Sequence, residues 1–288
     1  MNRRDLLTTC GAIATVAAFP ELRAVAAPAK DGPARLAALE TSHGGRLGVA
    51  VHDTESGQRF SYRGHERFLM CSTFKLPLVA AVLMRVDRGE ERLDRRIVFD
   101  QDAILDWAPV TMLNVGAPGM TIEQLCEAAT LVSDNTAANL LLETLGGPAG
   151  FTAFIRRLGD SATQLDHVEP LNDAQSGEQD TTTPLAMLGA LYKLLVGDAL
   201  SEASRRKLMR WITLNQTGAH GLEAGLPANW RIGDKTGSAS TANNDIGIIW
   251  PPDRAPVLVT AYYTNSERDS RQRKQVLMAV GSLVASTI

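Results

Sequence analysis

Apolar residues alternate with polar ones near both ends of the chain, whereas in the middle they recur every three or four positions. Alternation is typical of strands, and it predicts five of them at residues 46–53, 58–62, 230–235, 245–250 and 257–264. The longer spacing is typical of helices, and it predicts six in the middle at residues 69–86, 122–131, 136–145, 151–158, 184–195 and 202–211. Two more helices are expected near the ends, at residues 32–42 and 271–286. The pattern therefore predicts a sheet built from both ends of the chain and a helical middle.

Composition narrows the classes of protein that this pattern can represent. The 288 residues, 44% of them hydrophobic and 21% charged, can bury a large core as one compact unit or as two interleaved lobes. The formal net charge is −3, and no basic patch indicates a nucleic-acid partner. The five histidines are scattered, and no group of Cys or His has the spacing of zinc ligands. We therefore expect no metal, no other cofactor and no nucleic acid.

Residues 1–26 have the features of a secretory signal. Arg3 and Arg4 form a basic start, residues 6–19 are mildly apolar, and Ala24-Val25-Ala26 is a small-residue cleavage site. The arginine pair also fits a twin-arginine signal, so the Sec and twin-arginine routes both stay open. The apolar stretch is shorter than the roughly 20 residues of a membrane-spanning helix. The sequence thus predicts a periplasmic or secreted protein without a stable membrane anchor.

Three short motifs carry the candidate chemistry: Ser72-Thr73-Phe74-Lys75, Ser133-Asp134-Asn135 and Lys235-Thr236-Gly237. A lone S-x-x-K turns up about once in a chain of this length, but the two tripeptides are each expected in roughly one such chain in twenty or fewer. Chance is therefore a poor explanation for the three motifs together. If they did occur by chance, Ser72 and Lys75 would be only a solvated pair at the surface. The combination indicates a serine acyl-transfer site.

Ser72 and Lys75 are the candidate reacting pair. Three residues apart on a helix, their side chains would rise from one face. A serine hydroxyl is a poor nucleophile at neutral pH unless an amine of depressed pKa, or a carboxylate acting through water, takes its proton. Burial and neighbouring cations are expected to depress the pKa of Lys75. A position at the start of the helix would also aim backbone N–H groups at the bond under attack.

Together the three motifs resemble the signature of the class A serine β-lactamases. The similarity extends through Leu140-Leu141-Leu142-Glu143-Thr144-Leu145-Gly146-Gly147, Asp180-Thr181-Thr182-Thr183-Pro184, Ala224-Gly225-Leu226-Pro227 and Asn244-Asp245-Ile246, and so covers essentially the whole mature chain. The resemblance implies an α+β fold, in which a five-stranded antiparallel sheet with flanking helices meets an all-helical lobe at an active-site cleft. Residues 27–63 and 214–288 would form the α/β lobe, and residues 64–213 the all-helical lobe.

The resemblance also implies roles for individual residues. Ser72 would be the nucleophile, and Ser133, held by Lys235, would return the proton to the leaving ring nitrogen. The backbone N–H groups of Ser72 and Ser238 would form the oxyanion hole. The expected substrate-binding residues are Asn135, Asn172, Lys235, Thr236, Gly237, Ser238 and Trp107. Two of these have a structural alternative, since Asn135 could be a helix cap and Trp107 could be packed in the lobe.

The segment Glu169-Pro170-Leu171-Asn172 is where the family keeps the glutamate that activates water for deacylation. Here the segment is one residue shorter than the family pattern. The arginine that normally precedes the glutamate by two positions, and pairs with an aspartate like Asp180, is His167. A histidine is a weaker, pH-dependent partner. We therefore hypothesise a less firmly held loop around Glu169.

Other departures concern the cysteines and the cations. Cys71 and Cys126 lack the partners with which relatives form disulfides, so we expect two buried thiols in spite of an oxidising compartment. An arginine for the substrate carboxylate is hard to locate. Arg271 and Arg273 are weak candidates, and a solvated charge on the last helix is the expected role of each.

The sequence thus predicts a monomeric enzyme whose partner is a small-molecule β-lactam, which it hydrolyses through an acyl-enzyme on Ser72. Two alternatives share the first half of that reaction. A penicillin-binding receptor or sensor domain would acylate and stay acylated, and a D,D-peptidase would act on cell-wall peptides.

Overall fold

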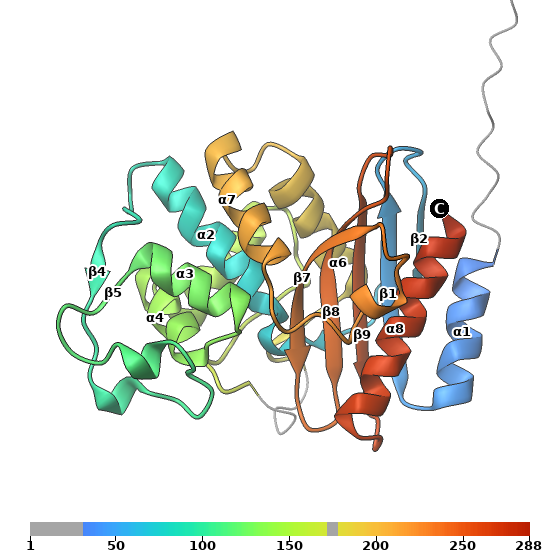
Figure 1. Ribbon diagram of the computed structural model, residues 1–288, viewed down its shortest axis with the longest axis horizontal. Helices are drawn as coiled ribbons and strands as arrows, with labels where there is room; N and C mark the ends of the chain where they lie inside the picture. The colour runs from blue at the N-terminus through green and yellow to red at the C-terminus, as the bar shows by residue number, and fades with distance from the viewer. Residues whose placement is uncertain (1–30, 172–177) are drawn as a thin grey trace, which may run out of the picture.

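The computed structural model describes residues 31–171 and 178–288. The predicted signal at residues 1–26 and the predicted substrate residue Asn172 lie outside these residues. A sheet with flanking helices forms one part of the molecule and a group of helices the other (Figure 1). The sheet is antiparallel, has the order β2-β1-β9-β8-β7, and consists of Arg46–Asp53 (β1), Arg59–Tyr62 (β2), Arg231–Ser238 (β7), Asn243–Trp250 (β8) and Val257–Thr264 (β9).

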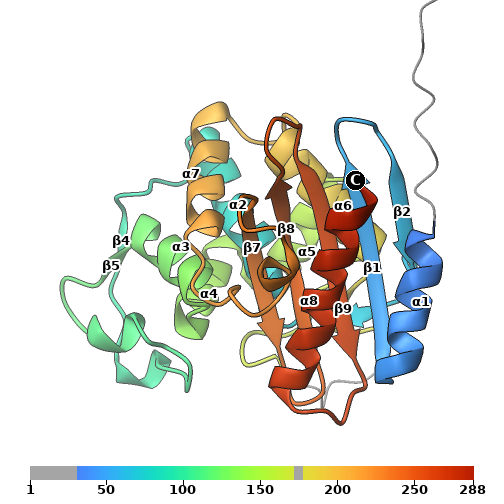
Figure 2. The same cartoon turned by 45° about the vertical axis from the view of Figure 1, so that its right-hand side comes forward.

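The two ends of the chain meet in the middle of this sheet. Strand β1 pairs with β9 along its whole length, from Arg46 opposite Thr264 to Asp53 opposite Val257. Both faces are buried, because alternate residues of β9 belong to two different cores. Val259 and Ala261 pack with helices α1 (Gly32–His43) and α8 (Ser270–Thr287), which cover one face (Figure 2). Leu258 and Tyr262 belong to the core shared with the remaining helices.

Helix α2 (Lys75–Asp87) runs through the centre of the helical part. It is apolar on every side and all of its residues from Lys75 to Met84 are buried, which is the pattern of a core helix. Five further helices pack in the same core: α3 (Ile122–Leu131), α4 (Asn135–Leu145), α5 (Gly147–Arg157), α6 (Pro184–Leu191) and α7 (Glu202–Thr213). A 3-10 turn, Cys71–Phe74, leads into α2 and carries Ser72.

Several elements differ from the sequence prediction. The middle of the chain is not wholly helical, because Phe68–Leu69 (β3) pairs with Thr181–Thr182 (β6) and Arg96–Ile97 (β4) pairs with Met120–Thr121 (β5). Two-residue ladders are too short to give an alternating pattern. The helix predicted at 184–195 ends as a π-helix, Tyr192–Val196. The remaining 3-10 turns are Gln101–Ala103, Thr111–Leu113 and Glu223–Gly225. Within the described ranges, no helix has the length and apolarity needed to cross a membrane.

Candidate active site

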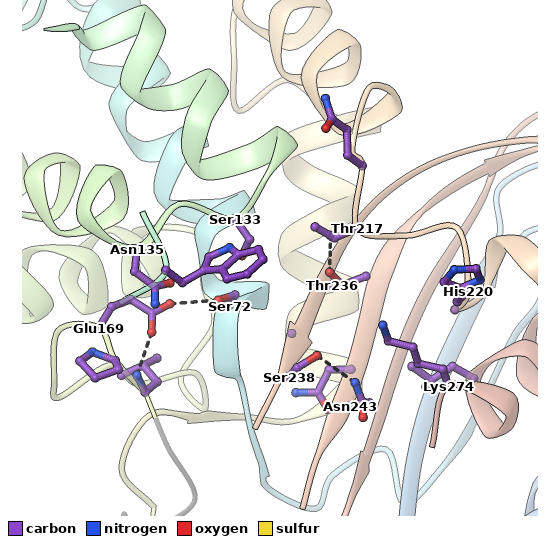
Figure 3. Close-up of a pocket in the computed structure, with 18 residues that line it drawn as sticks. Ser72, Ser133, Asn135, Glu169, Thr217, His220, Thr236, Ser238, Asn243 and Lys274 are labelled. Atoms are coloured by element: carbon purple, nitrogen blue, oxygen red, sulfur yellow. Dashed lines mark hydrogen bonds between the residues drawn. The ribbon is translucent and has the colours of Figure 1, made fainter. Parts of the chain in front are cut away.

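A pocket of about 630 Å³ lies where the helices meet the edge strand β7. Ser72, Ser133, Asn135 and Glu169 line the helical wall, and Thr236, Gly237 and Ser238 line the wall formed by β7 (Figure 3). The three predicted motifs, whose first residues are up to 163 positions apart in the sequence, thus converge on one cavity. Lys75 and Lys235 are fully buried behind its surface.

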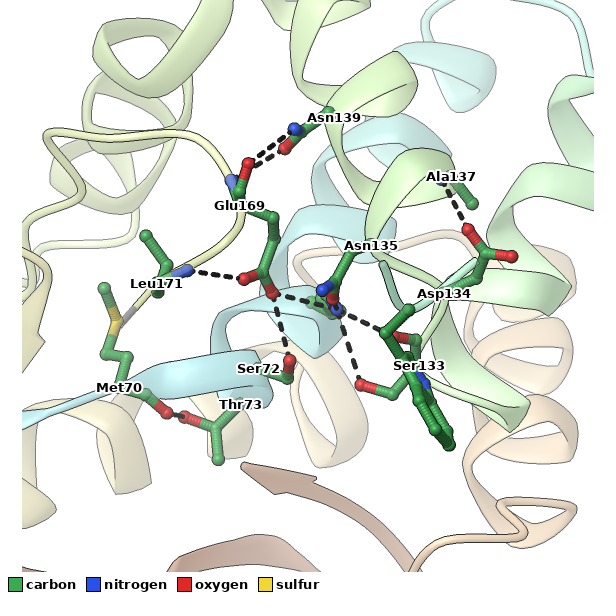
Figure 4. Close-up of polar contacts among 12 residues, drawn as sticks. Met70, Ser72, Thr73, Ser133, Asp134, Asn135, Ala137, Asn139, Glu169 and Leu171 are labelled. Carbon is green, nitrogen blue, oxygen red and sulfur yellow. Dashed lines mark hydrogen bonds and ion pairs between the residues drawn. The ribbon is translucent and has the colours of Figure 1, made fainter. Parts of the chain in front are cut away.

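The hydroxyl of Ser72 donates a hydrogen bond of 3.0 Å to Glu169 Oε1 (Figure 4). The same carboxylate oxygen lies 2.9 Å from Lys75 Nζ. The sequence predicted that Lys75 would reach the serine hydroxyl, but here the two side chains are linked through Glu169. Of the two proton acceptors that the sequence left open, the carboxylate is the one in contact with the nucleophile.

Lys75 is held by oxygens on three sides. Its Nζ donates to Asn135 Oδ1 at 2.6 Å and to the backbone carbonyl of Ser133 at 2.9 Å, in addition to the contact with Glu169. Burial lowers the pKa of Lys75, although Glu169 and Asp134 oppose that effect. A lowered pKa was predicted for this lysine, and its cause is desolvation.

Ser133 lies between the two buried lysines. Its Oγ accepts from Lys235 Nζ at 3.1 Å and from Lys75 Nζ at 3.4 Å. The backbone φ of Ser133 is +60°, a left-handed conformation that turns this residue out of the regular path into α4. Burial, reinforced by the charge of Lys75, lowers the pKa of Lys235 to about 7. The hydroxyl of Ser133 therefore has two possible proton donors.

Asp134, rather than Asn135, caps helix α4, so the alternative of a capping role for Asn135 is wrong. The carboxylate of Asp134 accepts from the backbone N–H of Ala137 at 2.9 Å and from that of Thr111 at the same distance. This leaves Asn135, the first residue of the helix, to direct its side chain at Lys75.

Glu169 is 4% exposed and is fixed by three hydrogen bonds besides those of its Oε1. Asn139 donates to the backbone carbonyl of Glu169 at 3.0 Å and accepts from its N–H at 2.9 Å. The N–H of Leu171 donates to Oε2 at 2.8 Å. Asn139 was not among the residues predicted from the sequence, where its only signal is that it follows Asn135 by four positions and so lies on the same helix face.

His167 pairs with Asp180, as the sequence suggested for the position of the missing arginine. Their side chains are 2.7 Å apart, with Asp180 buried and the imidazole 45% exposed. The other carboxylate oxygen of Asp180 accepts from the backbone N–H groups of Asp166 and His167 at 2.8 and 3.0 Å. One buried carboxylate thus holds the chain that leads into Glu169.

The wall formed by β7 lies close to the backbone of Ser72 at Gly237. A Cβ there would lie 2.9 Å from the carbonyl oxygen of Met70 and 3.2 Å from the nitrogen of Ser72, so the strand can come this near only with glycine. On either side of it, the hydroxyl of Thr236 contacts that of Thr217, and Ser238 Oγ accepts from Asn243 Nδ2 at 2.8 Å.

The residues at the mouth of the pocket correct some expectations. Trp107 lines the pocket and is 56% exposed, so the alternative of a packed core residue is wrong. Arg273 is not a solvated charge: it is 5% exposed and donates to Asn243 Oδ1 at 2.7 Å and to the carbonyl of Ala239 at 3.2 Å. Cys71 and Cys126 are buried thiols, as predicted, and burial raises the pKa of the Cys126 thiol.

Comparison with known proteins agrees with this geometry. A family model described as "Beta-lactamase enzyme family" matches residues 33–288. The chain is 44% identical over 253 residues to "Beta-lactamase OXY-2" of Klebsiella oxytoca, with 87% of each chain covered. It is 43% identical over 287 residues to "Beta-lactamase CTX-M-25" of Escherichia coli, with 99% of this chain and 97% of that one covered.

Solved structures show the same relation. "Ancestral (GNCA) Beta-lactamase class A" superposes with a TM-score of 0.87 at 55% identity, covering 89% of this chain and all of the other. A structure described as the putative class A β-lactamase PenP from Rhodopseudomonas palustris has the same TM-score at 46% identity, with 89% and 99% covered. The chain therefore belongs to the class A β-lactamases, a family of serine hydrolases.

Proposed function

We propose that this enzyme hydrolyses the β-lactam ring of penicillin- and cephalosporin-type antibiotics through a covalent acyl-enzyme on Ser72, and thereby confers resistance. The observation that carries the proposal is the position of Glu169 Oε1, which is within 3.0 Å of both Ser72 Oγ and Lys75 Nζ. A carboxylate in that position can accept a proton from the serine during acylation and from water during deacylation.

In acylation, Ser72 Oγ bonds to the ring carbonyl carbon and the C–N bond of the ring breaks. The serine proton passes to Glu169 or to Lys75, whose pKa is lowered by burial. The ring nitrogen takes a proton from the hydroxyl of Ser133, which Lys235 and Lys75 can resupply. Ser72 is in contact with Glu169, Glu169 with Lys75, and Ser133 with both lysines, so these transfers require no large movement of the site.

The backbone supplies the electrostatic part of the reaction. The N–H groups of Ser72 and Ser238 are the proposed oxyanion hole. The close approach at Gly237 brings the backbone of β7 near the turn that carries Ser72. Asn135, Thr236 and Ser238 present polar groups to the pocket for the amide and carboxylate of the substrate. Asn172 keeps its proposed part in substrate or water binding on the basis of the family resemblance alone.

In deacylation, water adds to the ester carbon and the bond to Ser72 Oγ breaks. Glu169 takes the proton of the water, and Ser72 regains one. The bonds from Asn139 and Leu171 hold the carboxylate in place for this step. Slow deacylation would make the same site a penicillin receptor or a stalled D,D-peptidase, so this step decides between the candidate functions.

The proposal includes export and a monomeric state. The N-terminal residues 1–26 have the composition of a secretory signal. Cell fractionation would place the enzyme outside the cytoplasm if this part is right. Light scattering of the purified mature chain would give the mass of a single copy.

Intact-protein mass spectrometry, sampled from seconds to hours after mixing with a penicillin, tests the reaction. The parent enzyme should consume the drug with at most a transient adduct. Glu169→Ala should accumulate an adduct of the mass of the drug, because deacylation slows by roughly 10³-fold. Ser72→Ala should form none.

Glu143→Ala is a matched control, since Glu143 is an exposed carboxylate on α4 outside the pocket. It should behave like the parent. A persistent adduct on the parent would make the protein a receptor, and intact drug without any adduct would contradict the proposal.

A further inference from the structure

Asn244 links the sheet to the turn that carries the nucleophile. It lies on β8 opposite Gly237 of β7 and is 1% exposed. Its amide nitrogen donates to the backbone carbonyls of Leu69 and Met70, at 2.8 and 3.1 Å. These two residues immediately precede the 3-10 turn that carries Ser72. A side chain of the sheet therefore holds the segment from which the nucleophile projects.

The orientation of the Asn244 amide is set by its neighbours. Its oxygen accepts from the backbone N–H of Tyr263 at 3.3 Å, whereas its nitrogen faces two carbonyl oxygens. The reverse orientation would place the amide oxygen against those carbonyls and the amide nitrogen against an N–H donor. Asparagine is thus matched to this position, since it presents two N–H donors on one side and an acceptor on the other.

The backbone carbonyl of Met70 is the point at which the sheet and the turn meet. It also accepts from the N–H of Thr73 at 3.2 Å and from the hydroxyl of the same residue at 2.7 Å (Figure 4). A Cβ on Gly237 would lie 2.9 Å from this carbonyl oxygen. Thr73 thus holds the carbonyl from within the turn, and Asn244 holds it from the sheet.

The residue between this carbonyl and the nucleophile has a strained backbone. The φ of Cys71 is +46°, in the left-handed region that residues other than glycine seldom adopt. Such a conformation costs free energy and persists only where its surroundings determine it. Contacts on both sides of Cys71 supply that constraint, because Met70 is bound by Asn244 and Ser72 is bound by Glu169.

We propose that Asn244 is a positioning residue that sets the separation of the two N–H groups in the oxyanion hole. The inference rests on the proposed function, which assigns that role to the N–H groups of Ser72 and Ser238. Ser72 follows the Met70 carbonyl by two residues, and Ser238 follows Gly237, which lies opposite Asn244. Without the amide, the turn is freer to move relative to β7, which takes the two donors away from the position of the developing oxyanion.

Quenched-flow mass spectrometry of Asn244→Ala with a penicillin tests this assignment. Acylation and deacylation both pass through a tetrahedral state with negative charge on the former carbonyl oxygen, so both depend on the oxyanion hole. We expect each rate constant to fall about ten-fold, less than the roughly 100-fold or larger loss on removing such a donor outright. A defect confined to deacylation would place the fault at Glu169 and would overturn the inference.

The infrared spectrum of the acyl-enzyme gives a readout that a loss of stability alone would not change. The adduct can be accumulated on Glu169→Ala, with and without Asn244→Ala. Weaker hydrogen bonds to the ester carbonyl should shift its stretching band to higher wavenumber in the double variant. Asn244→Ser keeps a hydroxyl donor and leaves a smaller cavity than alanine would only if the side chain still packs, so it should change the rates and the band in the same direction by a smaller amount. It carries the test if Asn244→Ala does not fold.

Thr260→Val is the matched control. The hydroxyl of Thr260 is buried and donates to the backbone carbonyl of Pro184 at 2.9 Å, but Thr260 does not line the pocket. The substitution should lower the urea midpoint and leave both rate constants and the carbonyl band unchanged. Parent-like rates, or an unshifted band, in a folded Asn244 variant would overturn the inference and leave the proposed function intact. A parent chain that is never acylated would overturn both.

Discussion

The two walls of the pocket are built in different ways. The wall formed by β7 is held by main-chain pairing, with every residue from Arg231 to Ser238 opposite a residue of β8. The opposite wall includes the irregular segment that carries Glu169, which is held by side chains, mainly Asn139 and Asp180. Main-chain pairing distributes the stabilisation over many hydrogen bonds, whereas a segment held by a few side chains depends on each of them. Single substitutions of the residues that hold each wall in place should therefore impair catalysis at the Glu169 segment and, apart from that of Asn244, affect mainly stability behind β7.

Among the residues that hold the two walls in place, the largest effect is expected from Asn139→Ala. Loss of both hydrogen bonds to the Glu169 backbone should misplace the carboxylate and lower kcat about 100-fold, since displacements near 1 Å cost that much. Stopped-flow kinetics should locate the loss in deacylation. The urea midpoint should change little.

Asn114→Ala is the matched control, because Asn114 also donates to a backbone carbonyl, that of Val110, but is exposed and outside the pocket. An Asn139 variant with the kcat of the parent would show that Glu169 is held by its other contacts.

The next effect concerns a buried carboxyl pair behind β7. Asp234 Oδ1 accepts from Asn215 and Asp245 Oδ2 from the N–H of Leu222. Their other oxygens, Asp234 Oδ2 and Asp245 Oδ1, are buried and have no partner in the described part of the chain. Burial raises the pKa of Asp245 well above that of an ordinary carboxyl, and the charge of Asp234 adds to this. A proton between the two would satisfy both oxygens.

Asp245→Asn should therefore be more stable than the parent, by a margin that grows as the pH rises. Above the ordinary carboxyl pKa, the native pair still binds a proton that the unfolded chain has lost. The free energy of unfolding of the parent therefore falls as the pH rises above that value. The asparagine amide supplies the donor at every pH. Urea unfolding between pH 5 and 9 should show the variant gaining on the order of 1 kcal/mol over the parent, with kcat within about three-fold. A parent whose stability rises relative to the variant over this range would contradict the prediction.

The smallest effect is expected at His167. His167 Nδ1 lies 2.7 Å from Asp180 Oδ2 and so helps to hold the segment that leads into Glu169. Because the imidazole is 45% exposed, His167→Ala should slow deacylation by only about two- to three-fold. His167→Arg keeps a donor at this position and should deacylate like the parent. Equal deacylation rates of the parent and His167→Ala would show that the segment does not depend on this pair.

The strands of the sheet were predicted from local patterns, and the convergence of the motifs was predicted from their resemblance to the class A signature. Strands β1 and β9 and helix α3 have the predicted bounds, since their apolar patterns are long and regular. The motifs with fixed spacing identified the residues around Ser72.

What the sequence could not predict depends on neighbours from distant segments. The link from Ser72 to Lys75 through Glu169 joins positions 97 residues apart in the chain. Arg273 was predicted to be a solvated charge on the last helix, but in the fold it is buried against the start of β8. Lys274, which also lines the active-site pocket, belongs to no motif, and only its position in the folded pocket distinguishes it from the other basic residues of α8.

The close approach at Gly237 has a consequence for how this enzyme can evolve. Because there is no room for a side chain between β7 and Ser72, the backbone fixes the depth of the pocket and substitutions cannot change it. Variation that changes the antibiotic spectrum is restricted to the rim, where Trp107 and Lys274 face the pocket from outside the sheet. Substitutions that extend resistance to further antibiotics should therefore arise at the entrance of the pocket, while the catalytic residues stay unchanged.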